Sequence, residues 1–227
     1  MKKRILLFSG GLDSLLLKQM ENFKNNECLY INLHTVENKQ EMQFIKMNFP
    51  GCIIIDLSLQ RFELNNKIIP FRNHILSMIA ANFGNSLYFA FTKGDTTKDK
   101  DYVFKSQIEN ILNYFSIDTN KVTIPGPFEI CMPFKELTKT EVINLFLRKG
   151  GDYRLLQKAT SCYSGIEGGC GTCRSCLRKY VACYNNDIKL NFQPSIQELE
   201  ILLKEAIKKG RNKEIKEIKA CIKQRQQ

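Results

Sequence analysis

The feature that most constrains this chain is an apolar segment that runs directly into a glycine-rich loop and then into an apolar helix. Residues 4–8 are predominantly apolar, the loop reads Ser9-Gly10-Gly11-Leu12-Asp13-Ser14, and helix-compatible residues continue to Phe23. Glycines let the backbone turn sharply, and free amide groups at a helix N-terminus attract an anion such as phosphate. This order predicts a phosphate-binding loop between the first strand and the first helix of an α/β domain.

The loop differs from the common phosphate loop that carries Gly-Lys-Ser/Thr, because Asp13 stands where a cation is usual. A carboxylate suits this position when a Mg²⁺ ion lies between it and the phosphates. We therefore expect phosphate groups with Mg²⁺ at this loop.

Short β-rich segments alternate with helical patterns through the first two thirds of the chain, which predicts a parallel sheet flanked by helices. The expected strands are residues 4–8, 28–33, 52–57 and 87–91, and a strand end with a turn is expected at 122–127. The expected helices are 12–23, 39–48, 72–82, 102–115, 142–147 after a capping box at 138–141, 195–208 and 212–224. We predict an α/β nucleotide-binding domain in residues 1–150 and a zinc-binding, helical region in 151–227, with a helix break at Gly210.

Charge and cysteine content restrict the partners and the compartment. Of the formal net charge of +11, residues 201–227 contribute nine Lys and Arg against three Glu. A basic helical tail of this kind is typical of a solvated helix face, so nucleic acid is not the expected partner. No apolar run approaches the roughly 20 residues that a membrane helix needs. Nine cysteines, an odd number, favour free thiols in a reducing compartment, and we expect a cytoplasmic protein.

Four of the cysteines form a compact motif that predicts a metal site. Cys170, Cys173 and Cys176 follow one another at three-residue steps on an expected tight turn, and Cys162 lies eight residues upstream. Four thiolates favour structural zinc, and an iron–sulfur cluster is the alternative. Arg174 and Arg178 are expected to offset the thiolate charge. The remaining cysteines are expected to be ordinary buried or incidental residues: Cys28, Cys52, Cys131, Cys183 and Cys221.

The motif at 9–14 resembles that of the PP-loop, or N-type ATP pyrophosphatase, family. Together with the cysteine pattern, it makes the chain similar to the 7-cyano-7-deazaguanine synthase family over most of residues 4–183. Segments 69–73 (Ile-Pro-Phe-Arg-Asn), 137–142 (Leu-Thr-Lys-Thr-Glu-Val) and 161–163 (Ser-Cys-Tyr) carry the same resemblance. It implies an adenine nucleotide α-hydrolase-like, Rossmann-like fold and cleavage of ATP between its α and β phosphates.

The resemblance also implies a reaction and a set of site residues. ATP activates the carboxylate of 7-carboxy-7-deazaguanine, ammonia gives the amide, and a second ATP-dependent step gives the nitrile. No glutaminase domain fits in the chain, so ammonia is expected to be free or delivered by a partner. We expect a homodimer. The implied ATP-binding residues are Phe8, Ser9, Gly10, Gly11, Leu12, Asp13, Ser14 and Arg72, and the implied catalytic residues are Asp13, Ser14 and Lys139.

The segment after the strand at 87–91 departs from the family, because it lacks the usual Tyr-Pro-Asp-Cys-Arg-like stretch. Loops at the carboxyl ends of parallel strands bind ligands, so we expect the loop at 93–102 to lie over the substrate pocket. The candidate substrate-binding residues are Asn73, Lys93, Gly94, Asp95 and Asp99, and His34 is a further possible cleft residue. The loop at 34–41 also lacks an expected basic run.

Three other functions compete with this hypothesis. A divergent paralogue would join a deazaguanine carboxylate to a protein or peptide amine. A tRNA-modifying PP-loop ligase or thiolase would use the basic C-terminal helices to hold RNA. A non-enzymatic zinc module would bind nucleic acid, but the complete phosphate loop argues against it.

Overall fold

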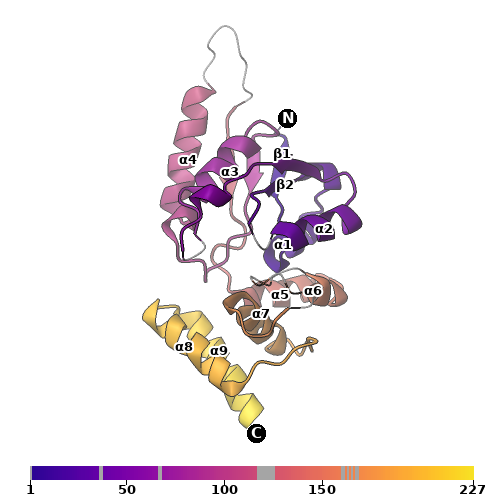
Figure 1. Ribbon diagram of the computed structural model, residues 1–227, viewed down its shortest axis with the longest axis vertical. Helices are drawn as coiled ribbons and strands as arrows, with labels where there is room; N and C mark the ends of the chain where they lie inside the picture. Colours follow the sequence, from indigo (N-terminus) through magenta and orange to yellow (C-terminus); the bar gives the residue numbers. More distant parts are fainter. Residues whose placement is uncertain are drawn as a thin grey trace.

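A five-stranded, fully parallel sheet forms the centre of the molecule (Figure 1). The computed structural model describes residues 2–35, 38–65, 68–116, 126–159, 162, 164, 166 and 169–227. In these residues the strand order is β3-β2-β1-β4-β5. The strands are β1 (Arg4–Leu7), β2 (Cys28–Asn32), β3 (Ile53–Asp56), β4 (Ser86–Tyr88) and β5 (Glu129–Cys131). All described pairs are parallel, with Leu6 opposite Cys28 and Tyr88.

Helices cover both faces of the sheet, since successive side chains of a buried strand point to opposite sides. Leu6 belongs to the core under α1 (Leu12–Met20), α2 (Asn38–Asn48) and α5 (Lys139–Arg148), whereas Ile5 belongs to the core under α3 (Arg72–Ala80) and α4 (Tyr102–Phe115). The two layers lie on opposite sides of the strands in Figure 1. The single-turn helices are Asn25–Glu27, Gln60–Phe62 and Lys98–Lys100.

The remaining helices extend the molecule beyond the sheet. They are α6 (Arg154–Lys158), α7 (Arg174–Tyr184), α8 (Ile196–Lys208) and α9 (Asn212–Gln226). Helix α7 packs against α5 and also against the hairpin formed by α8 and α9, which lies at the lower end of Figure 1. Gly210 has a positive φ of 62° between α8 and α9, as expected for the predicted break. No helix in the described part of the chain is long and apolar enough to cross a membrane.

The fold class is confirmed, and each of the four expected strands forms, although the one expected at 87–91 spans Ser86–Tyr88. Other local details also differ from the expectations. The first helix ends at Met20 rather than Phe23, because Asn22 adopts a left-handed φ of 52°. β5 was not expected; the strand end expected at 122–127 lies mostly outside the described residues. Helix α7 was also not expected: Cys173 is its N-cap and Cys176 lies in its first turn, so the tight turn does not extend through Cys176.

Candidate active site and metal centre

The glycine-rich loop joins β1 to α1 at the carboxyl end of the sheet. Gly10 has a φ of 69°, and a Cβ at this position would lie 2.8 Å from Cδ1 of Phe44, so a side chain is excluded. The hydroxyl of Ser14 donates to the carbonyl of Gly11 at 3.0 Å and lies 3.4 Å from the hydroxyl of Ser9. Two hydroxyl groups therefore meet beside the first turn of α1, where backbone amides favour an anion.

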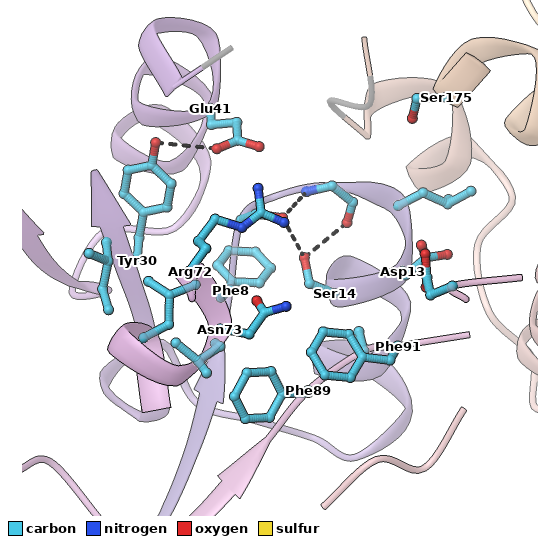
Figure 2. A pocket seen from close by; sticks show the side chains of 18 of the residues that line it. Phe8, Asp13, Ser14, Tyr30, Glu41, Arg72, Asn73, Phe89, Phe91 and Ser175 are labelled. Carbon is cyan, nitrogen blue, oxygen red and sulfur yellow. Dashed lines mark hydrogen bonds between the residues drawn. The ribbon is translucent and has the colours of Figure 1, made fainter. Parts of the chain in front are cut away.

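A cavity of about 320 Å³ lies above this loop. It is lined by seven of the eight residues expected to bind ATP, namely Phe8, Ser9, Gly11, Leu12, Asp13, Ser14 and Arg72. Gly10, the eighth, shapes the turn without lining the cavity. Figure 2 shows Arg72 and Asn73, from the start of α3, around the same space as Ser14 from α1. The structure thus brings the phosphate loop and the start of α3 to one cavity.

Lys139 closes one side of the cavity through an ion pair with Asp13. Its ammonium donates hydrogen bonds to both oxygens of the Asp13 carboxylate. Lys139 is buried at the start of α5, where the predicted capping box is present: the backbone amide of Glu141 donates to the hydroxyl of Thr138, and the Glu141 carboxylate accepts from the Thr138 amide. The capping box fixes the first turn of α5 and so directs Lys139 toward the phosphate loop.

The expected substrate-binding residues occupy different places. Asn73 and Asp95 line the cavity, whereas Lys93, Gly94 and Asp99 do not. Asn73 donates to the Asp99 carboxylate at 2.7 Å, which ties the loop after β4 to α3. Lys93 is exposed and lies 3.7 Å from Glu136.

Asp95 is a largely buried carboxylate, with its side chain 18% exposed, and it is held between two cations. It lies 3.6 Å from Lys100 and 3.6 Å from Arg178, and it accepts from the amide of Thr92 at 2.9 Å. Burial alone would raise the pKa of Asp95, but the two cations and the Thr92 amide outweigh it and hold this pKa well below its usual value. Asp95 is therefore ionised at neutral pH and forms part of the charged end of the cavity.

The sequence analysis missed an apolar part of the cavity beside the charged end, where Nζ of Lys100 lies 5.4 Å from the centroid of the Phe91 ring. Phe89 and Phe91 line it, and their ring centroids are 4.8 Å apart. Tyr30 donates to the carboxylate of Glu41 at 3.3 Å, and both residues also line the cavity (Figure 2). Tyr30 belongs to β2, and the two phenylalanines follow β4 directly. Their position near the carboxyl ends of the strands was the available signal.

His34, the further candidate, does not line the cavity. Its side chain is exposed, and its Nε2 lies 3.2 Å from the Asp56 carboxylate. It belongs to the surface beside β3.

The four expected metal-binding cysteines converge beside the same cavity. The sulfur atoms of Cys162, Cys170, Cys173 and Cys176 all lie within 4.8 Å of one another. The Cys170 and Cys176 sulfurs are 3.9 Å apart. A tetrahedral zinc ion with Zn–S bonds of about 2.3 Å separates its ligand atoms by about 3.8 Å, so these four sulfurs fit zinc. Cys162 and the neighbouring Ser175 also line the cavity, which places the metal centre at its wall.

The arginines beside the cysteines have other partners than expected. Arg174 pairs with Glu205 at 3.0 Å, and Arg178 pairs with Glu214 at 2.7 Å and with Asp95. Carboxylates from the loop after β4 and from the C-terminal hairpin thus neutralise these arginines. Whether they also offset the thiolates stays a prediction, because the sequence did not reveal the carboxylates that the fold brings to α7.

The other five cysteines have no part in the metal cluster of the described residues. Burial raises the pKa of Cys28 to about 12 and that of Cys183 to about 11. Both thiols are therefore protonated and unreactive at neutral pH.

Comparison with known proteins gives a family match that includes the cysteine cluster. The family model for the "Queuosine biosynthesis protein QueC" matches residues 51–187, more than half of the chain. The chain belongs to this family. The match covers α3, the loop after β4, Lys139 and all four clustered cysteines, whereas the phosphate loop and the α8–α9 hairpin lie outside it.

Several curated relatives of this QueC-family chain are named 7-cyano-7-deazaguanine synthase. The one from Desulfotalea psychrophila is 25% identical, over 76% of this chain and 89% of the relative. The one from Nostoc punctiforme is 26% identical, over 79% and 94%. The one from Pyrococcus horikoshii is 24% identical, over 79% and 92%. The chain thus spans nearly the full length of these relatives.

Proposed function

We propose that this QueC-family protein is an ATP-dependent ligase that converts 7-carboxy-7-deazaguanine and ammonia into 7-cyano-7-deazaguanine. The observation that carries the proposal is a single cavity with three different walls. The phosphate loop forms one wall, the cysteine-bearing start of α7 forms another, and Phe89 and Phe91 form an apolar third. Such a cavity suits a nucleoside triphosphate beside a flat, purine-like carboxylic acid.

The proposed chemistry starts from the poor leaving group of a carboxylate. A carboxylate oxygen attacks the α-phosphorus of ATP and pyrophosphate leaves. Ammonia then attacks the acyl adenylate, and AMP leaves with one of the original carboxylate oxygens. In the second step the amide oxygen attacks the α-phosphorus of another ATP, and pyrophosphate leaves. Loss of AMP, with that oxygen, and of two protons from nitrogen gives the nitrile.

Residues of the charged end would stabilise the leaving pyrophosphate. The amides of the first turn of α1 and the Ser9 and Ser14 hydroxyls would donate to phosphate oxygens. Lys139 and Arg72 would supply positive charge from two other helices. Asp13 holds the Lys139 ammonium at the cavity wall, so we assign it a role in orienting this cation.

Magnesium and zinc complete the proposal. Mg²⁺ would accompany the phosphates of ATP and offset their negative charge. Asp13, the carboxylate of the phosphate loop, lines the cavity and would bind this ion. Zinc would be held by the four clustered cysteines, and it would fix the start of α7. A closed set of four thiolates leaves no open position for a substrate, so this metal would be structural.

The direct test is incubation of the purified protein with ATP, Mg²⁺, ammonia and 7-carboxy-7-deazaguanine, followed by mass spectrometry. We expect the nitrile, preceded by the amide, and pyrophosphate release that depends on the acid. Omission of ammonia should stop both products. Absence of acid-dependent pyrophosphate release would reject the proposal.

The homodimer remains a prediction, which light scattering checks by a mass twice the 26.3 kDa of one chain.

A further inference from the structure

A chain of largely buried ion pairs runs from the C-terminal helix α9 to the wall of the cavity. Glu214 of α9 accepts from Nη2 of Arg178 at 2.7 Å and from its Nε at 3.2 Å. Nη1 of Arg178 lies 3.6 Å from Asp95, and Asp95 lies 3.6 Å from Lys100. The side chains of Glu214 and Arg178 are only 10% and 12% exposed. The cavity is lined by Arg178, Asp95 and Lys100, but not by Glu214.

The backbone at Gly94 is packed directly onto this chain of charges. A Cβ at Gly94 would lie 1.9 Å from Oε1 of Glu214 and 2.0 Å from Nη2 of Arg178. These separations are far below van der Waals contact, so no side chain fits without displacing the ion pair. Gly94 is therefore required here for close approach, and the loop after β4 lies against α7 and α9.

Apolar packing also holds the hairpin that carries Glu214 against α7. Leu177, Tyr180 and Val181 of α7 form a core with Leu199, Leu202, Ile218 and Cys221 of the hairpin. This core positions α9 independently of the ion pairs. Since the hairpin lies beyond residue 187, where the family match ends, nothing in that match assigns it a role at the cavity.

We propose that Glu214 and Arg178 are positioning residues that hold the loop at 92–101 in its place over the cavity, so that the C-terminal hairpin helps to set the affinity for the carboxylic acid substrate. The identity of that substrate rests on the proposed function. Without these ion pairs, the loop would have to become ordered when the acid binds. The free-energy cost of that ordering would weaken binding of the acid. ATP would be affected less, because its phosphates are held by the loop at 9–14 on another element.

A second ion pair between the hairpin and α7 provides a control for effects on stability alone. Glu205 of α8 pairs with Arg174 of α7 at 3.0 Å, so this pair also joins the hairpin to α7. Neither Glu205 nor Arg174 lines the cavity. Glu205→Gln therefore removes a second, more exposed ion pair between the hairpin and α7 and leaves the loop contact intact.

The test combines hydrogen–deuterium exchange with kinetics for wild type, Glu214→Gln, Glu214→Asp, Gly94→Ala and Glu205→Gln. Exchange of the peptide at 92–101 needs no substrate, and we expect it to accelerate about 5-fold or more in Glu214→Gln and Gly94→Ala. The KM for the acid should rise about 10-fold with kcat and the KM for ATP changed less than about 2-fold. Glu214→Asp should recover part of the loss, and Glu205→Gln should behave as wild type in both measurements.

Each outcome decides the inference. Unchanged loop exchange in a folded Glu214→Gln variant, or equal changes in Glu205→Gln, would overturn it. If Glu214→Gln does not fold, Gly94→Ala carries the test alone. If wild type does not act on the acid, the proposed function fails, while loop exchange still decides whether Glu214 positions the loop.

Discussion

Asp13 and Lys139 are 126 residues apart in the chain and meet at the phosphate loop. Replacing Asp13 with Asn keeps the shape of the side chain and removes its charge, so the Lys139 ammonium and the metal-bound phosphates lose their partner. We expect the fold to persist and pyrophosphate release to fall about 100-fold or more, which a coupled pyrophosphate assay measures.

The matched control is Asp152→Asn, which removes an exposed carboxylate paired with Arg154 away from the cavity. It should retain wild-type turnover. Wild-type turnover in Asp13→Asn would remove Asp13 from the mechanism.

Asp95 makes a signed prediction for acid stability. Its pKa in the fold is lowered, so its ionised form stabilises the protein above its ordinary pKa of 3.8, and this contribution is lost as the pH falls below that value toward the folded pKa. Chemical denaturation between pH 5 and pH 2, bounds of roughly the range in which carboxylates titrate, should give a steeper loss in wild type than in Asp95→Asn. Equal slopes would show that Asp95 has the same pKa in the folded and unfolded states.

At the residue scale, the sequence predicted the sites that are formed by residues close together in the chain. The loop at 9–14 and the four cysteines were readable because turn geometry and ligand spacing are local properties. The partners of Arg178 were not readable, since Asp95 and Glu214 lie far from it in the chain. Tyr30 and Phe89 were missed for the same reason: strand residues reveal burial, but not which cavity they line.

At the element scale, the cysteine cluster lies at the start of α7, whose N-cap is Cys173. Cys173→Ser should lower zinc content and the unfolding temperature together, because structural zinc binding contributes folding free energy on the order of 10 kcal/mol in small zinc modules. Elemental analysis and thermal unfolding measure both quantities.

Cys131→Ser is the control, since Cys131 is a partly exposed cysteine outside the cluster. A Cys173→Ser variant that is metal-free and as stable as wild type would rule out structural zinc. Iron in place of zinc would favour the iron–sulfur alternative.

Helix starts were predicted well where a capping box marks them, as at Thr138 before α5. Two other elements, β5 and α7, were missed. β5 has only three residues, Glu129–Cys131, too few for an alternating pattern to appear. Helix α7 begins inside the cysteine motif, where metal-binding residues concealed the start of a helical pattern.

At the scale of the whole molecule, the boundary at residue 150 remains a prediction. Phe146 before it and Leu156, Ala182 and Cys183 after it belong to one core. The sequence predicted the α/β sheet and the helical C-terminus, because each has its own hydrophobic period. It could not predict how the hairpin α8–α9 approaches the cavity, since that contact depends on packing between distant elements.

The central claim is that the protein adenylates the carboxylate of 7-carboxy-7-deazaguanine. The most direct measurement uses acid labelled with ¹⁸O in both carboxylate oxygens, together with ATP, Mg²⁺ and ammonia, and determines the mass of the AMP formed. We predict AMP that carries one ¹⁸O atom, because the bond between carbon and the transferred oxygen breaks when AMP leaves. Unlabelled AMP, or ADP and phosphate in place of AMP and pyrophosphate, would contradict the account.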